Sequence, residues 1–369
     1  MKHLVRFFKK EAVLCVAALC ALLSMLAVPP DAQYAGYIDV RVLCLLFCLM
    51  GVVLGLEGCG LFRLLAERLL SGCRRLRLLV LLLVLLPFFI SMLVTNDVAL
   101  LTFVPFALLV LHMLGKPELV VQVVVLQTLA ANLGSMATPV GNPQNLYLYS
   151  YYNLSPGQFF RVLLPLTLVS LLALALASLA VKRDDIQVHF SNPIQLQSPK
   201  KLLLYLVLFL FCLLSVFRAL HFGLLTALVF VCLLCFDRRL LGKIDYSLLL
   251  TFACFFVFAG NLGRIGPVRE ALTALLSQST LISSALASQV ISNVPAAVLL
   301  SGFTQDWSGL LAGVNIGGLG PPIASLASLI SLRFYLREPG AKGGRYLLFF
   351  TLANLLGLCI LLPLAAWLG

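Results

Sequence analysis

The chain alternates long apolar runs with short polar and basic segments, and one run has a polar interruption at its centre. Leu78 to Leu111 is apolar almost throughout except at Thr95-Asn96-Asp97. A straight helix of this length would measure about 50 Å, well beyond the ~30 Å hydrocarbon core of a bilayer. Arginines stand before the run and Lys116 after it, so both ends belong to one basic side. The pattern predicts a helical hairpin with the polar triplet at its tip. Such a hairpin is either re-entrant or crosses the membrane as two full spans, because both return to the same side.

A second run with the same design, Leu281 to Phe303, has Ser292-Asn293-Val294-Pro295 at its centre. Two further runs are broken. Leu119 to Tyr152 is interrupted between Asn132 and Asn145, and Leu310 to Leu332 between Asn315 and Pro322. Both interruptions are rich in glycine, proline and asparagine, which do not continue a regular helix, so each predicts a discontinuous span.

The remaining apolar runs are uninterrupted and predict ordinary spans. They are Ala12–Val28, Ile38–Leu56, Arg161–Val181, Leu202–Phe217, Phe222–Phe236, Tyr246–Leu262 and Tyr346–Trp367. Helical spacing of apolar residues predicts amphipathic surface helices over Glu57–Arg77 and Gly263–Gln278.

The distribution of basic residues orients these spans. Only five of the 26 Lys and Arg residues fall in predicted outer segments, namely Arg41, Arg161, Arg218, Arg264 and Arg269. The others fall in predicted inner segments, so the N-terminus is expected to be cytoplasmic. On this topology the two hairpins enter from opposite sides of the membrane.

The two halves repeat one order of elements: span, surface helix, Asn-tipped hairpin, broken span and final span. Asn132-x-Gly134 with Pro139 matches Asn315-x-Gly317 with Pro322 at identical spacing. Because the second copy starts from the opposite side, the repeats are predicted to be inverted, the plan of many secondary transporters. The expected divisions are an N-terminal span (1–36), a first repeat (37–181), a cytoplasmic linker (182–201), a scaffold helix pair (202–243) and a second, inverted repeat (244–369).

Composition agrees with an all-α polytopic membrane protein. Of the 369 residues 62% are hydrophobic and 11% are charged, and the apolar runs are continuous, whereas membrane β-strands alternate. The net charge of +12 lies in short segments between spans, so it indicates topology signals at a lipid bilayer and no nucleic-acid partner. Most of the eleven cysteines lie inside apolar runs and are interpreted as packing residues.

The hairpin tips and the breaks are where chemistry is expected. A helix that stops inside the bilayer leaves backbone groups that must face protein, water or a ligand. Unwound carbonyls suit cations and helix N-termini suit anions, while asparagine offers both donors and an acceptor. The candidate substrate- and ion-binding residues are Thr95, Asn96, Asp97, Asn132, Gly134, Thr138, Gly141, Asn142, Asn145, Ser292, Asn293, Asn315, Gly317 and Gly318. For the glycines, close helix packing is an equal alternative.

Asp97 is the strongest single candidate. A carboxylate in the membrane costs at least about 2.5–3.5 kcal/mol unless it is paired, so it indicates function by default. The alternative is that Asp97 caps the helix that begins after Asn96. We expect Asn96, Asp97 and Asn293 to be the ligands if a Na⁺ ion binds. No other cofactor is expected.

The motifs TNDVALLTFVP, NLGSMATPVGNPQN, SQVISNVPAAVLL and VNIGGLGPPIASLASLISLRFY resemble the ion transporter superfamily. That superfamily includes citrate, dicarboxylate and arsenite permeases and certain Na⁺/H⁺ antiporters, and the closest likeness is to YbiR-type bacterial inner-membrane permeases. The resemblance covers roughly Ile38 to Trp367. It implies an elevator-type homodimer in the inner membrane, with hairpins and broken helices in the moving part and the outer spans in the scaffold.

The resemblance is incomplete at the tips. In the dicarboxylate symporters both tips carry Ser-Asn-Thr, which binds sodium and a substrate carboxylate. Asn96 and Ser292-Asn293 match, but Thr95 replaces the first serine, and Asp97 and Val294 replace the threonines. The Asn-Asp tip is closer to the arsenite and antiporter branches, which weakens the implication of a di- or tricarboxylate substrate.

The sequence therefore predicts a secondary active transporter that moves a small ion, an anion such as a carboxylate or oxyanion, coupled to Na⁺ or H⁺. The alternative within transport is a cation/proton antiporter. An intramembrane enzyme is more remote, because it would need a catalytic pair at membrane depth and only Asp97 is found. A channel is disfavoured by the inverted repeat, and no Walker-type ATP motif is present.

Overall fold

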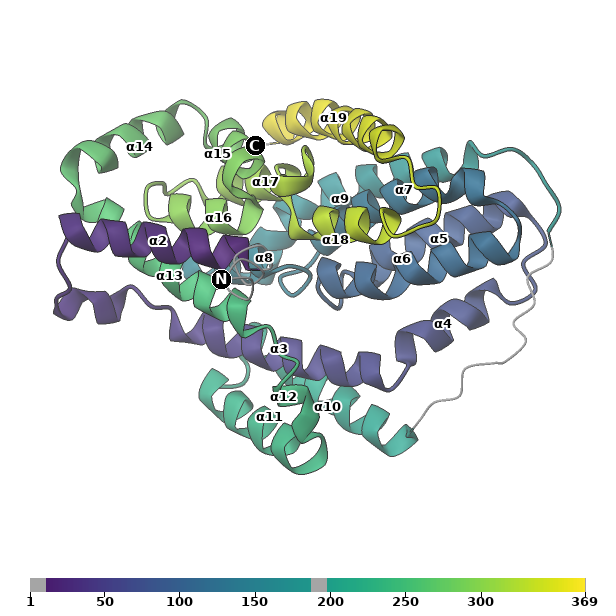
Figure 1. The fold of residues 1–369 in the computed structure, drawn as a ribbon. Helices are drawn as coiled ribbons and strands as arrows, with labels where there is room; N and C mark the ends of the chain where they lie inside the picture. Colours follow the sequence, from purple (N-terminus) through teal and green to yellow (C-terminus); the bar gives the residue numbers. More distant parts are fainter. Residues whose placement is uncertain (1–10, 187–197, 369) are drawn as a thin grey trace, which may run out of the picture.

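The fold is helical, as a computed structural model that describes residues 11–186 and 198–368 shows (Figure 1). Within this part of the chain there is no β-strand, only one isolated bridge between Arg75 and Asp185. The predicted all-α class is confirmed. The basic N-terminal residues Lys2, Arg6, Lys9 and Lys10 lie outside the described residues, as do positions 187–197 of the predicted linker.

The helices follow the predicted order. The first half contains α2 (Ala12–Ala27), η1 (Ala32–Gly36), α3 (Val40–Gly58), α4 (Leu61–Leu70), α5 (Leu76–Ile90), α6 (Asn96–Met113), η2 (Pro117–Leu119), α7 (Val120–Ser135), α8 (Pro143–Tyr151) and α9 (Pro156–Leu179). The second half contains α10 (Pro199–Val216), α11 (Phe222–Phe236), α12 (Arg238–Leu241), α13 (Tyr246–Arg264), α14 (Gly266–Gln278), α15 (Thr280–Ile291), α16 (Asn293–Ser301), α17 (Trp307–Ile316), η3 (Pro322–Ala324), α18 (Leu326–Tyr335) and α19 (Gly343–Leu368).

Among the described residues, seven helices are long and apolar enough to cross a membrane. An eighth candidate arises only if α14 and α15 are counted as one span, but the chain bends by 117° between them. The bend separates the predicted surface helix from the first arm of the second hairpin. The protein is therefore a multi-pass membrane protein.

One predicted element is shorter than expected. The amphipathic helix expected over Glu57–Arg77 is limited to α4, because Gly60, at φ +80°, separates it from α3. Glu57 belongs to α3 instead. Beyond α4, Leu76 N donates to Asp184 O over 3.0 Å, so the chain ahead of α5 is held by the segment that follows α9.

The helices pack in two groups. In one, α2 packs along α13, and α10 and α11 pack along α3. In the other, α5, α6, α7 and α9 pack on one another, as do α15, α16 and α17, while α18 and α19 lie against α7 (Figure 1). Helices α4 and α14 connect the groups, and the main contacts between the groups are those of α13 with α16 and of α3 with α8.

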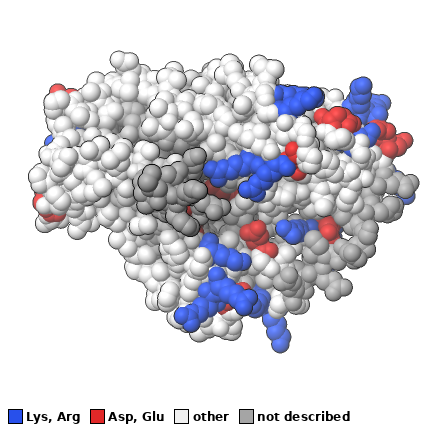
Figure 2. Space-filling view, in the orientation of Figure 1, with Lys and Arg blue, Asp and Glu red and all other residues white. Residues whose placement is uncertain are grey.

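Both ends of the first hairpin lie together. Ahead of its first arm, Leu76 N reaches Asp184 O, and after its second arm the Lys116 ammonium lies 2.5 Å from the Asp184 carboxylate. Lys116 holds the pKa of this exposed carboxyl below its usual value. His112 and Glu338, 2.6 Å apart, bring the end of α18 to the same place. In Figure 2 Lys and Arg side chains lie mainly over the right half and lower middle of the view, and few appear at the left end.

The two ends of the second hairpin also lie together, at Thr304 and not at Asp184. Thr280, which begins α15, lies 3.3 Å from Thr304, which follows α16. Tyr152, at the end of α8, donates to Thr304 O over 3.0 Å. On the same side, Arg218 donates to Tyr149 O over 3.3 Å. These contacts join only segments that the sequence places on the outer side.

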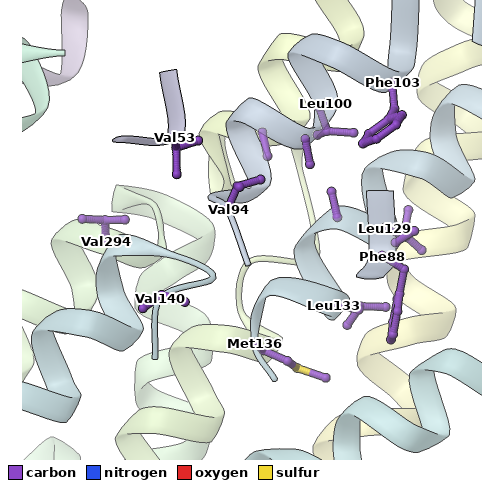
Figure 3. Packing of buried hydrophobic residues seen from close by; sticks show 14 of the residues in the cluster. Val53, Phe88, Val94, Leu100, Phe103, Leu129, Leu133, Met136, Val140 and Val294 are labelled. Carbon is purple, nitrogen blue, oxygen red and sulfur yellow. The ribbon is translucent and has the colours of Figure 1, made fainter. Parts of the chain in front are cut away.

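Each hairpin packs closely against the broken span of its own half. A Cβ on Gly134 of α7 would lie 2.1 Å from Phe88 O of α5, and one on Gly317 would lie 2.7 Å from Ser288 Cβ of α15. Figure 3 shows Phe88, Leu129 and Leu133 packed beside one another where α5 meets α7. This packing brings each hairpin tip to the break of the neighbouring helix.

Candidate functional site

The first tip is anchored to the break between α7 and α8. Asn96 N donates to Gly141 O over 3.2 Å, and Asn96 Nδ2 donates to Asn132 Oδ1 over 2.9 Å. Thr138 Oγ1 donates to Met92 O over 2.5 Å, which ties the break to the α5–α6 connection. Asn96 is buried and begins α6, so its position is determined by both helices. The first tip and the break of its own half therefore meet at this point.

The break itself is closed by asparagines. Asn142 caps α8, its Oδ1 accepting from Asn145 N over 2.9 Å. Asn145 Nδ2 faces the carbonyls of Ser135, Met136 and Thr138 at 3.1 to 3.5 Å. The carbonyls of Ser135 and Met136 stand at the end of α7, where helical partners run out, and Thr138 O lies in the break and also accepts from Gly141 N. The Asn145 side chain therefore holds the backbone of the break against the start of α8 in this conformation.

The second tip has a strained backbone. Ser292 has φ +72° and ψ 156°, a region that side chains with a Cβ avoid and that costs on the order of 1–3 kcal/mol. Its Oγ donates to Ala324 O over 3.2 Å, in the turn between α17 and α18. Asn293 Oδ1 accepts from Val294 N over 2.9 Å, and Asn293 Nδ2 lies against Gly318. This tip too meets the break of its own half.

The two breaks are hydrogen-bonded to each other. Asn315 Oδ1 accepts from Asn142 Nδ2 over 3.1 Å, and Asn315 Nδ2 donates to Asn145 Oδ1 over 2.6 Å. All three side chains are at least 95% buried. Seven predicted residues, Asn96, Asn132, Thr138, Gly141, Asn142, Asn145 and Asn315, thus belong to one polar cluster built from both halves.

Asp97 stands next to this cluster with an unsatisfied carboxylate. Its Oδ1 is buried and has no hydrogen-bond partner among the described residues. The capping role considered for Asp97 is not found, because Thr95 is the N-cap of α6 and Asn96 Oδ1 accepts from Asp97 N over 3.1 Å. Since a buried carboxylate oxygen without a partner is costly, a proton or a cation is the natural partner.

The candidate glycines divide into two kinds. Gly134 and Gly317 are packing positions, where a Cβ would meet the facing hairpin arm. Gly141 and Gly318 lie in the breaks, beside the tips: Gly141 O accepts from Asn96 N, and a Cβ on Gly318 would lie 3.0 Å from Asn293 Nδ2. Of the four glycines, only Gly141 and Gly318 have backbone atoms next to the asparagines of the hairpin tips.

Four polar residues that bond to the helix breaks were not among those predicted from the sequence. Ser325 and Ser328, at the start of α18, contact Asn132 at 3.1 and 3.4 Å. Gln289 Nε2 donates to Gly317 O and Leu319 O, and Asn354 Oδ1 accepts from Gly320 N. The polar positions of Gln289 and Asn354 inside apolar helices were the available signal.

The cluster is polar but carries no cationic side chain of its own. Asn, Ser and Thr oxygens and backbone carbonyls surround it, and Asp97 is the adjoining carboxylate. Within the described residues no group of three or more His, Cys, Asp or Glu could hold a metal ion, so ligands for a cation would be neutral oxygens with one carboxylate. The cluster thus offers neutral oxygens and amide donors, with the Asp97 carboxylate beside it.

Comparison with known proteins is consistent with this arrangement. The family model described as "Citrate transporter" matches residues 7–330. The "Uncharacterized transporter MJ0456" of Methanocaldococcus jannaschii is 35% identical over 284 residues, 77% of this chain and 78% of that protein. The "Inner membrane protein YbiR" of Escherichia coli K12 is 31% identical over 306 residues, 82% of this chain and 81% of that protein.

Proposed function

The chain belongs to the citrate transporter family, and from this premise we propose that it is a secondary active transporter for a small anion, a carboxylate or oxyanion, coupled to Na⁺ or H⁺. The observation that carries the proposal is the buried cluster that joins the first hairpin tip to both helix breaks, with the second tip held against the break of its own half. No Lys or Arg contributes to it, so the charge of an anion would be balanced by a cation that enters with it.

We further propose that transport follows an elevator mechanism between two inverted repeats. The two packing groups, joined by α4 and α14, support a scaffold and a moving part. Helix α4, which follows the predicted cytoplasmic end of α3, packs against both α5 and α6. An inward-facing state is part of the same proposal. The inner membrane, a cytoplasmic N-terminus and a homodimer are part of the same proposal.

The test is uptake into proteoliposomes that contain the purified protein. Carboxylates, arsenite and inorganic oxyanions are offered with a Na⁺ gradient or a proton gradient imposed separately. Gradient-driven accumulation of one anion class, absent from protein-free vesicles, is the expected result. Accumulation that is independent of both gradients, or no anion uptake at all, would contradict the proposal.

A second candidate function is cation/proton antiport, which the unpartnered Asp97 oxygen beside a cluster without cationic side chains favours. The same vesicles distinguish it. An antiporter would move Na⁺ or K⁺ against protons without any added anion, which a pH-sensitive dye inside the vesicles reports.

A further inference from the structure

A cavity of about 680 Å³ lies well apart from the polar cluster. It is bounded by the start of α9, the elbow between α14 and α15, the start of α17 and the end of α19. None of the tip or break residues lines it. The transport site therefore does not account for this cavity.

The cavity has a polar part and an apolar part. Ser279, Thr280 and Thr304 supply hydroxyl groups, and Leu166, Leu276 and Ala312 supply apolar walls. The helices beside it present apolar side chains outward: on α9 these are Leu164, Leu168, Leu172 and Leu176, and on α19 they include Leu348, Leu352 and Leu356. An occupant with a polar end and an apolar chain would match both the cavity and the surface around it.

The position of the cavity corresponds to the level of lipid headgroups. It lies at the ends of two long apolar helices, α9 and α19, next to the exposed surface helix α14. Both tryptophans of the chain are at this end: Trp307 lines the cavity, and Trp367, near the end of α19, is 81% exposed. Tryptophan concentrates at membrane interfaces, which supports this placement.

The charges lining the cavity select among headgroups. One cation, Arg161, and one carboxylate, Asp306, line it. Among the described residues Arg161 has no ion-pair partner, whereas Asp306 Oδ1 already accepts from Gly309 N and Ser308 Oγ. A phosphate matches the guanidinium of Arg161, and an ammonium matches the remaining carboxylate oxygen and the hydroxyl groups.

We propose that this cavity binds a zwitterionic phospholipid with a primary ammonium headgroup, phosphatidylethanolamine, with Arg161 at the phosphate and Asp306 at the ammonium. An anionic phosphatidylglycerol headgroup would face Asp306 without a counter-charge. A phosphatidylcholine headgroup has no N–H to donate to the carboxylate or to the hydroxyl groups. This lipid site is separate from the proposed transport site. The bound lipid would fill the space beneath the α14–α15 elbow.

The experiment measures retained lipid by native mass spectrometry. The purified full-length protein is incubated in detergent with equal amounts of phosphatidylethanolamine, phosphatidylglycerol and phosphatidylcholine. The wild type should retain one phosphatidylethanolamine in preference to the other two. Arg161→Gln should weaken that retention roughly tenfold, the expected loss for one charge-assisted contact. Arg269→Gln on the exposed face of α14 is the matched control and should retain the lipid as the wild type does.

Two further variants examine the headgroup and the chain. Asp306→Asn keeps the capping oxygen of α17 but removes the charge, so it should reduce the preference for phosphatidylethanolamine over phosphatidylglycerol. Ala366→Phe, at an exposed position lining the cavity, should lower retention of all three lipids. Equal retention of the three lipids by the wild type, or unchanged retention by Arg161→Gln, would overturn the proposal. So would displacement of the lipid by millimolar inorganic phosphate, which would identify a free-anion site.

Discussion

At the scale of single residues, the centre of the molecule depends on neutral amides. Asn132 accepts from Asn96 and Ser325 and also contacts Ser328, so one side chain joins the first tip to the start of α18. An amide can both donate and accept, and it carries no charge that would have to be paired when no ion is bound. Such a cluster can exchange internal hydrogen bonds for contacts with an ion at modest cost.

We expect Asn96→Ala and Asn293→Ala each to abolish or strongly reduce transport. Each change removes tip oxygens and donors, and Asn96→Ala also leaves Asn132 with one partner fewer, so stability should fall by about 1–3 kcal/mol. The matched control is Asn261→Ala, because Asn261 is equally buried but bonds Ser24 between α13 and α2. Uptake into proteoliposomes and thermal unfolding in detergent are the measurements. If both tip variants transport as the wild type does, the tips are not the site.

Asp97 is expected to determine how transport depends on pH. If its unpartnered oxygen receives either a proton or the coupling cation, the two compete, and the rate of uptake should change with pH at fixed Na⁺. Asp97→Asn keeps the size of the side chain and removes the competition. The variant should lose gradient-driven accumulation together with the pH dependence, while its melting temperature stays at or above that of the wild type because no buried charge remains. Accumulation with an unaltered pH profile would make Asp97 dispensable for coupling.

At the scale of elements, the two hairpins are placed by glycines that permit close helix contact. Gly134 lets α7 approach α5, and Gly317 lets the end of α17 approach α15. We predict that Gly134→Ala lowers stability by roughly 1–3 kcal/mol, because its Cβ would meet backbone atoms that cannot move independently. Gly263→Ala in α13, where no atom lies within 4 Å, should be neutral or slightly stabilising. Thermal unfolding of both variants in one detergent is the measurement, and equal melting temperatures would contradict the packing role.

The elements themselves were largely predictable from sequence. Continuous apolar runs gave the spans, and the breaks were marked by residues such as Pro139 and Pro322 that cannot continue a helix. The end of α4 was missed, although Gly72 follows it at φ +76° and the chain turns there to meet Asp184. Ser325 and Gln289 were also missed, since a polar residue becomes part of a site only through helices that the sequence does not place side by side.

At the scale of the whole molecule, the positions of the two ends of each hairpin show from which part of the molecule that hairpin starts. Both ends of the first hairpin meet at Asp184, and both ends of the second meet at Thr304. Each tip is nevertheless bonded to a helix break within the molecule. On the topology that the sequence predicts, the two hairpins start from opposite sides of the membrane. Two breaks that are bonded to each other would then be reached by two routes, which is the geometry that alternating access requires.

The last prediction follows from these routes. In a background without the native cysteines, Thr95→Cys should react with a small maleimide from the cytoplasmic side in the conformation described here. Substrate and an imposed gradient should change that rate as the site moves. Ser71→Cys and Ala271→Cys, at exposed positions of the predicted inner and outer segments, report each side independently and should react at constant rates. Labelling of Thr95→Cys from the outside alone, unaffected by substrate or gradient, would mean that the first hairpin is a pair of full spans, and the elevator proposal would fail with it.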